Sequence, residues 1–216
     1  MKSLRQSLHK QDLLGLGIMV ILFVVFYFLF DEEILDDYWE TNVILILINI
    51  IMAVSLNLIN GLTGQFSIGH AGFMAVGAYT SAIITVKLGM DFPIALIVAT
   101  VSAAFLGFLI GMPTLRLNGD YLAIATLGLG EIIRIAILNI DYVGGASGFM
   151  GIPRLTTFPI AFWIMVFVVY FIKNFKNSAD GRACLAIREN EIAAETMGIN
   201  TCLLYTSPSP RDYAAS

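Results

Sequence analysis

Long runs of apolar residues alternate with short polar stretches over most of the chain. A helix needs about 20 mostly apolar residues to cross about 30 Å of hydrocarbon, because it rises about 1.5 Å per residue. Six runs approach this length, at residues 13–30, 42–59, 71–86, 92–112, 121–140 and 158–172. The pattern predicts an all-α integral membrane protein, a polytopic bundle of about six transmembrane helices.

The first run follows Lys2, Arg5 and Lys10 and therefore resembles a signal peptide. Its apolar part is about 18 residues long, whereas a cleaved signal has an apolar region of about 7–15 residues followed by small residues at the cleavage site. No such site follows here. We interpret the run as an uncleaved first span.

The Lys and Arg residues predict the orientation of the bundle, because short loops rich in them stay in the cytoplasm. With a cytosolic N-terminus, the outer loops hold only Lys87 and Arg154. The inner stretches then hold Lys2, Arg5, Lys10, Arg116, Lys173, Lys176, Arg182 and Arg188. This predicts a cytosolic N-terminus at 1–12, a membrane domain at 13–172 and a cytosolic segment at 173–201. The acidic stretch 31–40 is expected to be an outer loop.

The composition supports the membrane class and excludes others. The chain is 58% hydrophobic and 13% charged, against about 45–50% and about 25% in soluble domains. Its scattered Lys and Arg residues make no nucleic-acid-binding surface. Cys184 and Cys202 form no CxxC, and only His9 and His70 accompany them, so we predict free thiols, no metal site, no cofactor and no catalytic residue.

Glu131 and Arg134 are two charges inside the fifth apolar run. A lone charge at mid-membrane costs on the order of 3 kcal/mol, and residues three apart on a helix meet on one face. The two are therefore expected to pair and to point into the protein. A structural ion pair and a polar lining of a solute path are both open readings.

A glycine-rich stretch at 57–79 precedes and enters the third run, "NLINGLTGQFSIGHAGFMAVGAY". Its polar residues are Gln65, Ser67 and His70. Glycine at this density disfavours a straight helix, and lipid tolerates broken backbone only where protein or a water-filled cavity shields it. We expect a break before Ala71, pointing to a transport path, and close packing by small residues after it.

The outer loop "GGASGFMGIP" is a second glycine-rich stretch. It lacks the GxxxxGK[ST] spacing of a phosphate-binding loop and follows no predicted strand. A flexible turn and a gating or docking loop are both open readings. The residues that define it are Gly144, Gly145, Gly148, Gly151 and Pro153.

The last polar segment before residue 201 contains a short predicted helix. Asn190 can cap a helix from Glu191 to Met197, with Gly198 as its C-terminal stop. Seven residues are marginal as an isolated helix, so this element is expected to dock on its own bundle or on a partner protein.

Four blocks in order resemble the LivM-type permeases of bacterial branched-chain amino acid ABC importers: "NLINGLTGQFSIGHAGFMAVGAYTSA", "RLNGDYLAIATLGLGEIIRI", "GGASGFMGIP" and "AIRENEIAAETMGIN". The resemblance covers about residues 42–200. It implies a non-enzymatic subunit of the inner membrane that moves a small amino acid with a second related permease, two cytosolic ABC ATPases and an extracytoplasmic solute-binding protein.

The resemblance also assigns regions to roles. The segment 173–201 would be a coupling loop that rests on an ATPase through Arg188, Glu189, Glu191, Ala193, Ala194 and Gly198. It is related to the "EAA" loop of ABC importers, although Ile192 stands where that loop usually has Glu. The substrate-path candidates are Gln65, Ser67, His70, Glu131 and Arg134.

Two further expectations concern the end of the chain and the rival functions. From Cys202 the stretch "CLLYTSPSPRDYAAS" leaves the family pattern and resembles translated adapter sequence, which predicts a disordered or artefactual tail at 202–216 on a C-terminally truncated fragment. A self-sufficient carrier or channel, with the Glu/Arg pair in an ion relay, and a membrane scaffold without cargo are the rivals.

Overall fold

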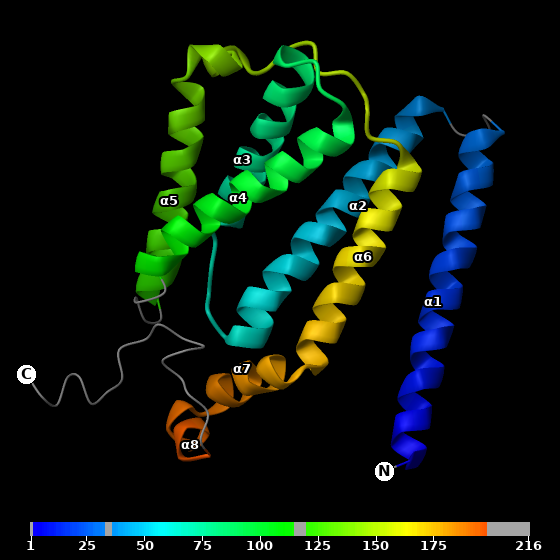
Figure 1. The fold of residues 1–216 in the computed structure, drawn as a ribbon, viewed down its shortest axis with the longest axis vertical. Coiled ribbons are helices and arrows are strands. Elements are labelled where there is room, and N and C mark those ends of the chain that lie inside the picture. The colour runs from blue at the N-terminus through cyan, green and yellow to red at the C-terminus, as the bar shows by residue number, and fades with distance from the viewer. Residues whose placement is uncertain (1, 33–35, 115–119, 198–216) are drawn as a thin grey trace, which may run out of the picture. The chain divides into compact units, whose positions relative to one another are not determined.

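The computed structural model describes residues 2–32, 36–114 and 120–197, and every regular element within these ranges is helical. Figure 1 shows the order of the helices along the chain. The α-helices are α1 (Lys2–Asp31), α2 (Asp37–Asn57), α3 (His70–Ala82), α4 (Phe92–Thr114), α5 (Asp120–Leu138), α6 (Phe158–Asn177), α7 (Ala179–Glu189) and α8 (Glu191–Thr196). Two π-helical turns, η1 (Leu58–Thr63) and η2 (Ile83–Lys87), continue α2 and α3.

Within the described residues, four helices are long and apolar enough to cross a membrane: Asp37–Thr63, Phe92–Gly111, Tyr121–Leu138 and Phe158–Asn177. A shorter apolar stretch, Gly17–Phe30, lies within α1. The third predicted span corresponds to α3 and η2 together, although α3 itself has only 13 residues. The prediction of a polytopic helical membrane protein is confirmed.

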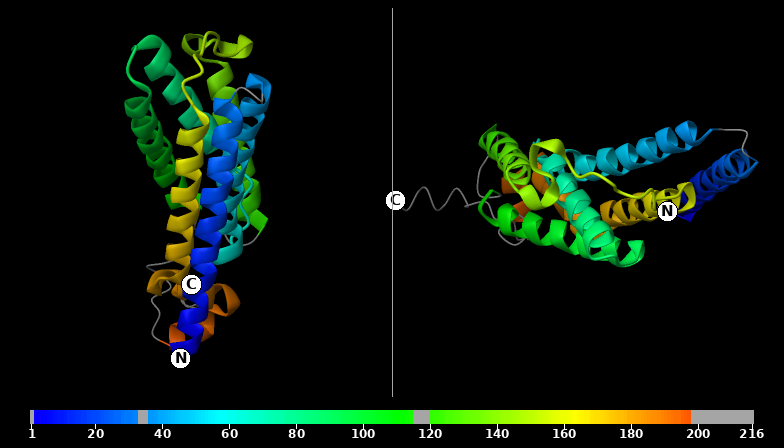
Figure 2. Two further views of the ribbon diagram at one scale, coloured as in Figure 1. Left: turned by 90° about the vertical axis from the view of Figure 1, so that its right-hand side faces the viewer. Right: turned by 90° about the horizontal axis from the view of Figure 1, so that it is seen from above.

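The chain forms two compact units, and the first comprises residues 1–51 and 156–170. Its core is the face of α6 that carries Phe158, Phe162 and Met165, packed with Leu47 of α2. Phe23 of α1 stacks on this face, with its ring centroid 5.9 Å from that of Phe158 and 5.0 Å from that of Phe162. Figure 2 shows α1 running along α6.

The acidic stretch 31–40, expected to be a loop, is partly helical, because α2 begins at Asp37. Asp37 and Glu40 lie in the first turn of α2, where the exposed N–H groups of a helix favour negative charge. Glu40 also accepts a hydrogen bond from the backbone N–H of Phe158 at 3.3 Å. The carboxylate thereby satisfies a backbone donor at the start of α6.

The second unit comprises residues 52–155 and 171–216, and α3, α4 and α5 pack against one another within it. Small residues allow the close contact of α3 with α4. Ala95 and Ala99 of α4 are buried, and the Ser102 hydroxyl donates a hydrogen bond to Thr80 Oγ1 at 3.2 Å. Of the two glycines in the GxxxG sequence of α4, Gly107 faces Phe73, whereas within the described residues no other part of the chain lies within 4 Å of the position of a Cβ on Gly111.

The predicted break before Ala71 is present. The π turn η1 ends at Gly64, which adopts a left-handed conformation with φ 72°, and the following residues run extended until α3 begins at His70. Figure 1 shows this connection as a thin, non-helical coil between the end of η1, which continues α2, and the start of α3. A residue with a Cβ is strained at such a φ, which explains why glycine stands there.

The chain after the sixth predicted span is more helical than the sequence indicated. The helix α6 continues past Ile172 to Asn177. Lys176 lies in its last turn, where a positive charge interacts favourably with the negative C-terminal end of the helix. The unpredicted helix α7 then begins after Ser178, whose hydroxyl accepts from the N–H of Gly181 at 3.1 Å. Asn190 caps α8 as predicted, accepting from Ala193 N at 3.0 Å, and Gly198 lies outside the described residues.

Candidate functional site

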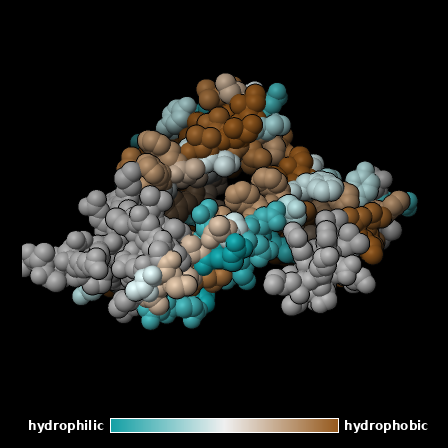
Figure 3. Space-filling view, turned by 60° about the horizontal axis from the view of Figure 1, so that its bottom comes forward, coloured by the Kyte–Doolittle hydropathy of each residue, from teal (hydrophilic) through white to brown (hydrophobic). Residues whose placement is uncertain are grey.

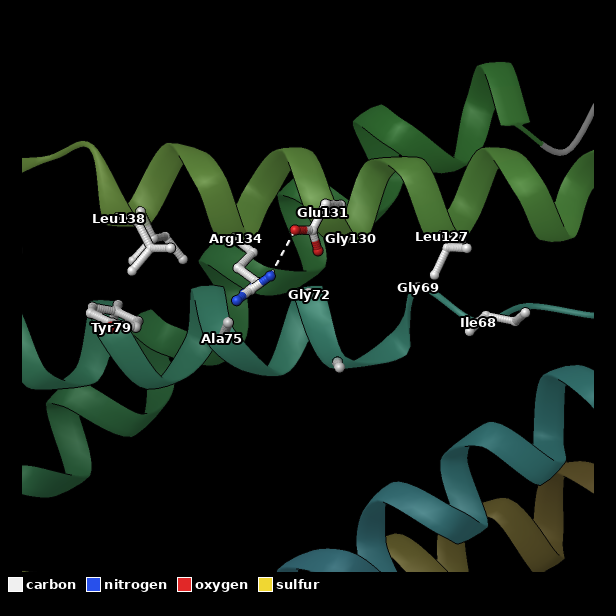
Figure 4. A pocket seen from close by; sticks show the side chains of 12 residues that line it. Ile68, Gly69, Gly72, Ala75, Tyr79, Leu127, Gly130, Glu131, Arg134 and Leu138 are labelled. Atoms are coloured by element: carbon white, nitrogen blue, oxygen red, sulfur yellow. Dashed lines mark hydrogen bonds and ion pairs between the residues drawn. The ribbon is translucent and has the colours of Figure 1, made fainter. Parts of the chain in front are cut away.

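A cavity of about 380 Å³ lies between α3 and α5 in the second unit. Figure 4 shows the two helices side by side, with Glu131 and Arg134 pointing from α5 toward α3. Glycine and alanine residues make up much of the α3 wall, and larger apolar residues line both ends. The lining residues are Ile68, Gly69, Ala71, Gly72, Ala75, Tyr79, Leu127, Gly130, Glu131, Arg134, Ile137 and Leu138.

Glu131 and Arg134 pair as predicted. Arg134 Nη1 donates to Glu131 Oε1 at 2.7 Å, across one turn of α5. The two side chains were expected to be enclosed by protein, but this chain alone does not bury them: 53% of the Glu131 side chain and 68% of the Arg134 side chain are exposed. The pair is therefore the polar part of an open, otherwise apolar cavity.

Glycine residues bring α3 and α5 together beside this cavity. A Cβ on Gly69 would clash with the carbonyl oxygen of Thr126, and one on Gly72 would lie 3.1 Å from the Cα of Gly130. The hydroxyl of Thr126 accepts a hydrogen bond from Ile68 N at 3.2 Å. The start of α3 is thus fixed to α5 at the end of the cavity that Ile68 and Leu127 line.

The other three path candidates do not line this cavity. His70 Nε2 lies 2.7 Å from Ser55 Oγ of α2, and Ser67 N donates to Asn60 Oδ1 at 3.1 Å. Gln65 is half-buried in the same connection. These contacts join α2, η1 and the start of α3, so they hold the broken segment together, while Glu131 and Arg134 lie in the cavity beyond it.

Sequence reasoning missed the apolar wall of the cavity, to which Tyr79, Leu127 and Ile137 contribute. Leu127, Gly130, Arg134 and Ile137 follow one another at spacings of three or four residues, so they share one side of α5. That spacing around Glu131 and Arg134 is the signal that could have identified the wall.

The predicted outer loop is ordered by tight turns. It contains two short 3₁₀ turns, Asp141–Val143 and Gly145–Ser147, and Gly144, Gly145, Gly148 and Gly151 all have positive φ. The Lys87 ammonium lies 3.8 Å from the ring centroid of Tyr142 and ties the loop to the end of η2. Pro153 is exposed in the extended stretch that follows.

The predicted coupling residues lie on α7 and α8, which pack against each other. Arg188, at the end of α7, donates to Glu189 and to the carbonyl oxygen of Gly61 in η1. Ala194 is only 3% exposed, whereas Ala193 and Met197 are exposed. Within this segment, Ala194 packs inside the chain and the Ala193 side of α8 faces outward. The side chain of Glu191 lies outside the described set.

Figure 3 turns the end of the molecule that carries α7 and α8 toward the viewer. Hydrophilic side chains gather there. Cys184 of α7 is buried and free, and Cys202 lies outside the described residues. In the described part of the chain, no three His, Cys, Asp or Glu residues form a group able to hold a metal ion.

The comparisons with known proteins agree with this architecture. The sequence profile of the family described as branched-chain amino acid transport system/permease component matches residues 38–204. No solved structure matches the chain.

Three curated relatives are similar to the chain. The high-affinity branched-chain amino acid transport system permease protein LivM of Escherichia coli K12 is 36% identical, across 72% of this chain and 45% of the relative. The protein of the same description from Salmonella typhimurium LT2 is 34% identical, across 90% of this chain and 52% of the relative. A probable branched-chain amino acid transport permease protein LivM of Methanocaldococcus jannaschii is 30% identical across 48% of this chain.

This chain spans about half the length of the first two of these relatives. The family profile covers most of the described helices, from the start of α2 through α8. The membrane-spanning helices and the glycine-broken segment both lie within the matched region. The chain therefore belongs to the family of permease components of branched-chain amino acid transport systems, as a LivM-type permease.

Proposed function

We propose that this chain is a membrane-spanning subunit of an ABC importer that carries branched-chain or related amino acids across the bacterial cytoplasmic membrane. In this proposal the N-terminus is cytosolic, and α7 and α8 face the cytoplasm. A second, related permease completes the path, two ABC ATPases supply the energy, and an extracytoplasmic binding protein delivers the solute. Membrane lipid surrounds the remaining helix faces.

The observation that carries the proposal is the ion pair of Glu131 and Arg134 in the α3/α5 cavity. A zwitterionic amino acid carries one ammonium and one carboxylate, and these two side chains offer the complementary charges. The aliphatic lining at Ile137 and Leu138 suits a branched side chain. More than half of each charged side chain is exposed, so both remain available to a solute or to a partner helix.

Placement of this pair in the membrane supports the same proposal. Charges within membrane spans face protein or a water-filled cavity rather than lipid, because exposure to hydrocarbon is costly. The cavity of this chain is open, so the second permease is the expected other wall. The small α3 residues beside Arg134, such as Ala75, leave room for a solute between the two subunits.

The helices α7 and α8, which are cytosolic in this proposal, support energy supply by a separate ATPase. A helix as short as α8 is marginal alone, and Met197, which directly follows it, is 82% exposed. An ABC permease needs such a docking element, whereas a self-sufficient carrier or channel does not.

ATP-driven uptake tests the proposal against its rival. The permease is co-expressed with the partner genes of its locus, purified as a complex and reconstituted with the binding protein in liposomes. We expect uptake of labelled leucine, isoleucine or valine that requires ATP and persists when an ionophore collapses the ion gradients. Uptake that needs an ion gradient and not ATP would establish the carrier instead.

A further inference from the structure

Arg188 connects the end of α7 to the turn that ends the second span. Its Nη1 donates to the carbonyl oxygen of Gly61, which lies 127 residues earlier in the chain. Its aliphatic stem passes beside Gly64, where an added Cβ would lie 2.6 Å from Arg188 Cγ. The carbonyl groups at the end of a helix carry partial negative charge, so a guanidinium is a suitable partner.

The surroundings make this contact part of a packed joint. Ile187 and Cys184 of α7 are buried, as is Leu62 of η1, and α7 packs on η1. Arg188 itself keeps 38% of its side chain exposed. The joint therefore combines buried apolar contact with one charge-assisted hydrogen bond at its rim.

A chain of hydrogen bonds continues from the joint to the α3/α5 cavity. Asn60 of η1 accepts from Ser67 N, and the next residue, Ile68, donates to Thr126 of α5. Ile68 and Gly69 line the cavity that holds Glu131 and Arg134. Between Gly64 and Gly69 the backbone makes no helical hydrogen bonds, so this segment can change conformation without breaking a helix.

We propose that Arg188 is a positioning residue that transmits displacement of the α7–α8 pair to the connection 61–69, and through it to the α3/α5 cavity. The inference rests on the proposed function, since it assumes that an ATPase moves α7 and α8. Gly64 is the other residue on which this contact depends. Its missing Cβ lets the Arg188 stem lie against the backbone of the connection.

Four single variants and one double variant of the complete permease, within its reconstituted transport complex, distinguish a loss of coupling from a loss of stability. Arg188→Ala removes both the hydrogen bond and the stem, and Arg188→Lys keeps the stem, the charge and a donor. Gly64→Ala puts a methyl group against the stem at a positive φ. Gly89→Ala is the matched control, because Gly89 also has a positive φ, 62°, but no other part of the described chain lies within 4 Å of its Cβ position.

The primary readout is the number of ATP molecules hydrolysed per leucine imported, at equal amounts of complex. A charge-assisted hydrogen bond accounts for about one order of magnitude in an equilibrium, so Arg188→Ala should raise this ratio roughly tenfold. Arg188→Lys should restore most of the coupling. Gly64→Ala should uncouple, Gly89→Ala should not, and Gly64→Ala combined with Arg188→Ala should be no worse than Arg188→Ala alone.

Hydrogen exchange of residues 61–68 in the purified permease is the second readout and does not depend on transport. We expect faster exchange there in Arg188→Ala. Faster exchange with an unchanged coupling ratio would make the contact purely structural and overturn the inference, as would unchanged exchange and coupling. If the unaltered complex imports no branched-chain amino acid, the proposed function fails, while exchange still tests the link between α7 and the connection.

Discussion

The carboxylate of Glu131 and the guanidinium of Arg134 lie 2.7 Å apart on α5, and the pair lines a cavity rather than a closed interior. Each charge neutralises the other within one turn of the same helix. A single substitution therefore leaves an unpaired ion in a membrane span, whereas a double substitution leaves none.

Replacing both residues of this pair should harm folding less than replacing Arg134 alone. We expect Arg134→Gln to destabilise the permease by about 1–3 kcal/mol and Glu131→Gln/Arg134→Gln by less, because only the single variant retains an orphan carboxylate. The yield of monodisperse protein in detergent and its thermal unfolding measure this. Equal losses in the single and double variants would show that the two charges do not stabilise each other.

Gly69→Ala should destabilise the contact between α3 and α5. The new methyl group would meet the backbone oxygen of Thr126, and overpacking of this kind typically costs about 1–3 kcal/mol. The control is Gly128→Ala on α5, where no other residue that the structure describes lies within 4 Å of the Cβ position and Ala favours the helix. Thermal unfolding in detergent should fall for the first variant only. A similar fall for both would contradict the close approach.

Much of this architecture could be predicted from apolar runs and glycine. The run lengths located α2 to α6 within about five residues, whereas α1 begins at Lys2, well before its predicted start. The glycine density before Ala71 indicated the break that Gly64 makes with its positive φ. The helix α7 was missed because it holds only two large aliphatic residues, Leu185 and Ile187, beside four charged ones. Its stability comes from the Ser178 cap and from packing on η1, and tertiary packing of this kind leaves little signal in local sequence.

The site was predicted only in part, because it also depends on tertiary packing. The pairing of Glu131 with Arg134 follows from their spacing alone, and it is confirmed. The open side of the cavity could not be predicted, because the burial of a span face depends on which helices cover it. The burial of Ala194 could not be predicted either. Ala193 and Ala194 are identical neighbours in the sequence, yet only Ala194 is buried against its own chain.

The Cys184 thiol should react slowly with iodoacetamide at pH 8. Burial raises the pKa of Cys184, and the negative charge of Asp180 raises that pKa further, so less of the reactive thiolate is present. The reaction should accelerate as the pH increases further and when the protein is unfolded. Because the folded pKa is raised, the contribution of this thiol to stability is present below its unfolded pKa and is lost as the pH rises.

Alkylation is followed by mass spectrometry in a Cys202→Ser background, so that Cys184 is the one thiol present. The control is Ala193→Cys in a Cys184→Ser/Cys202→Ser background, since residue 193 is exposed on α8. The control should react at the rate of a free thiol. Equal rates at Cys184 and at residue 193 in the folded protein would contradict the burial of α7 against η1.

The central claim, that α7 and α8 dock on an ATPase in the cytoplasm, is tested most directly by labelling Ala193→Cys with a membrane-impermeant maleimide. Ala194→Cys in the same cysteine-free background is the matched control, because its side chain is buried within the chain. We predict that residue 193 is labelled in inverted vesicles stripped of ATPase, is protected when the ATPase is added back, and is not labelled in intact spheroplasts. Labelling of residue 193 from outside intact spheroplasts would contradict the account.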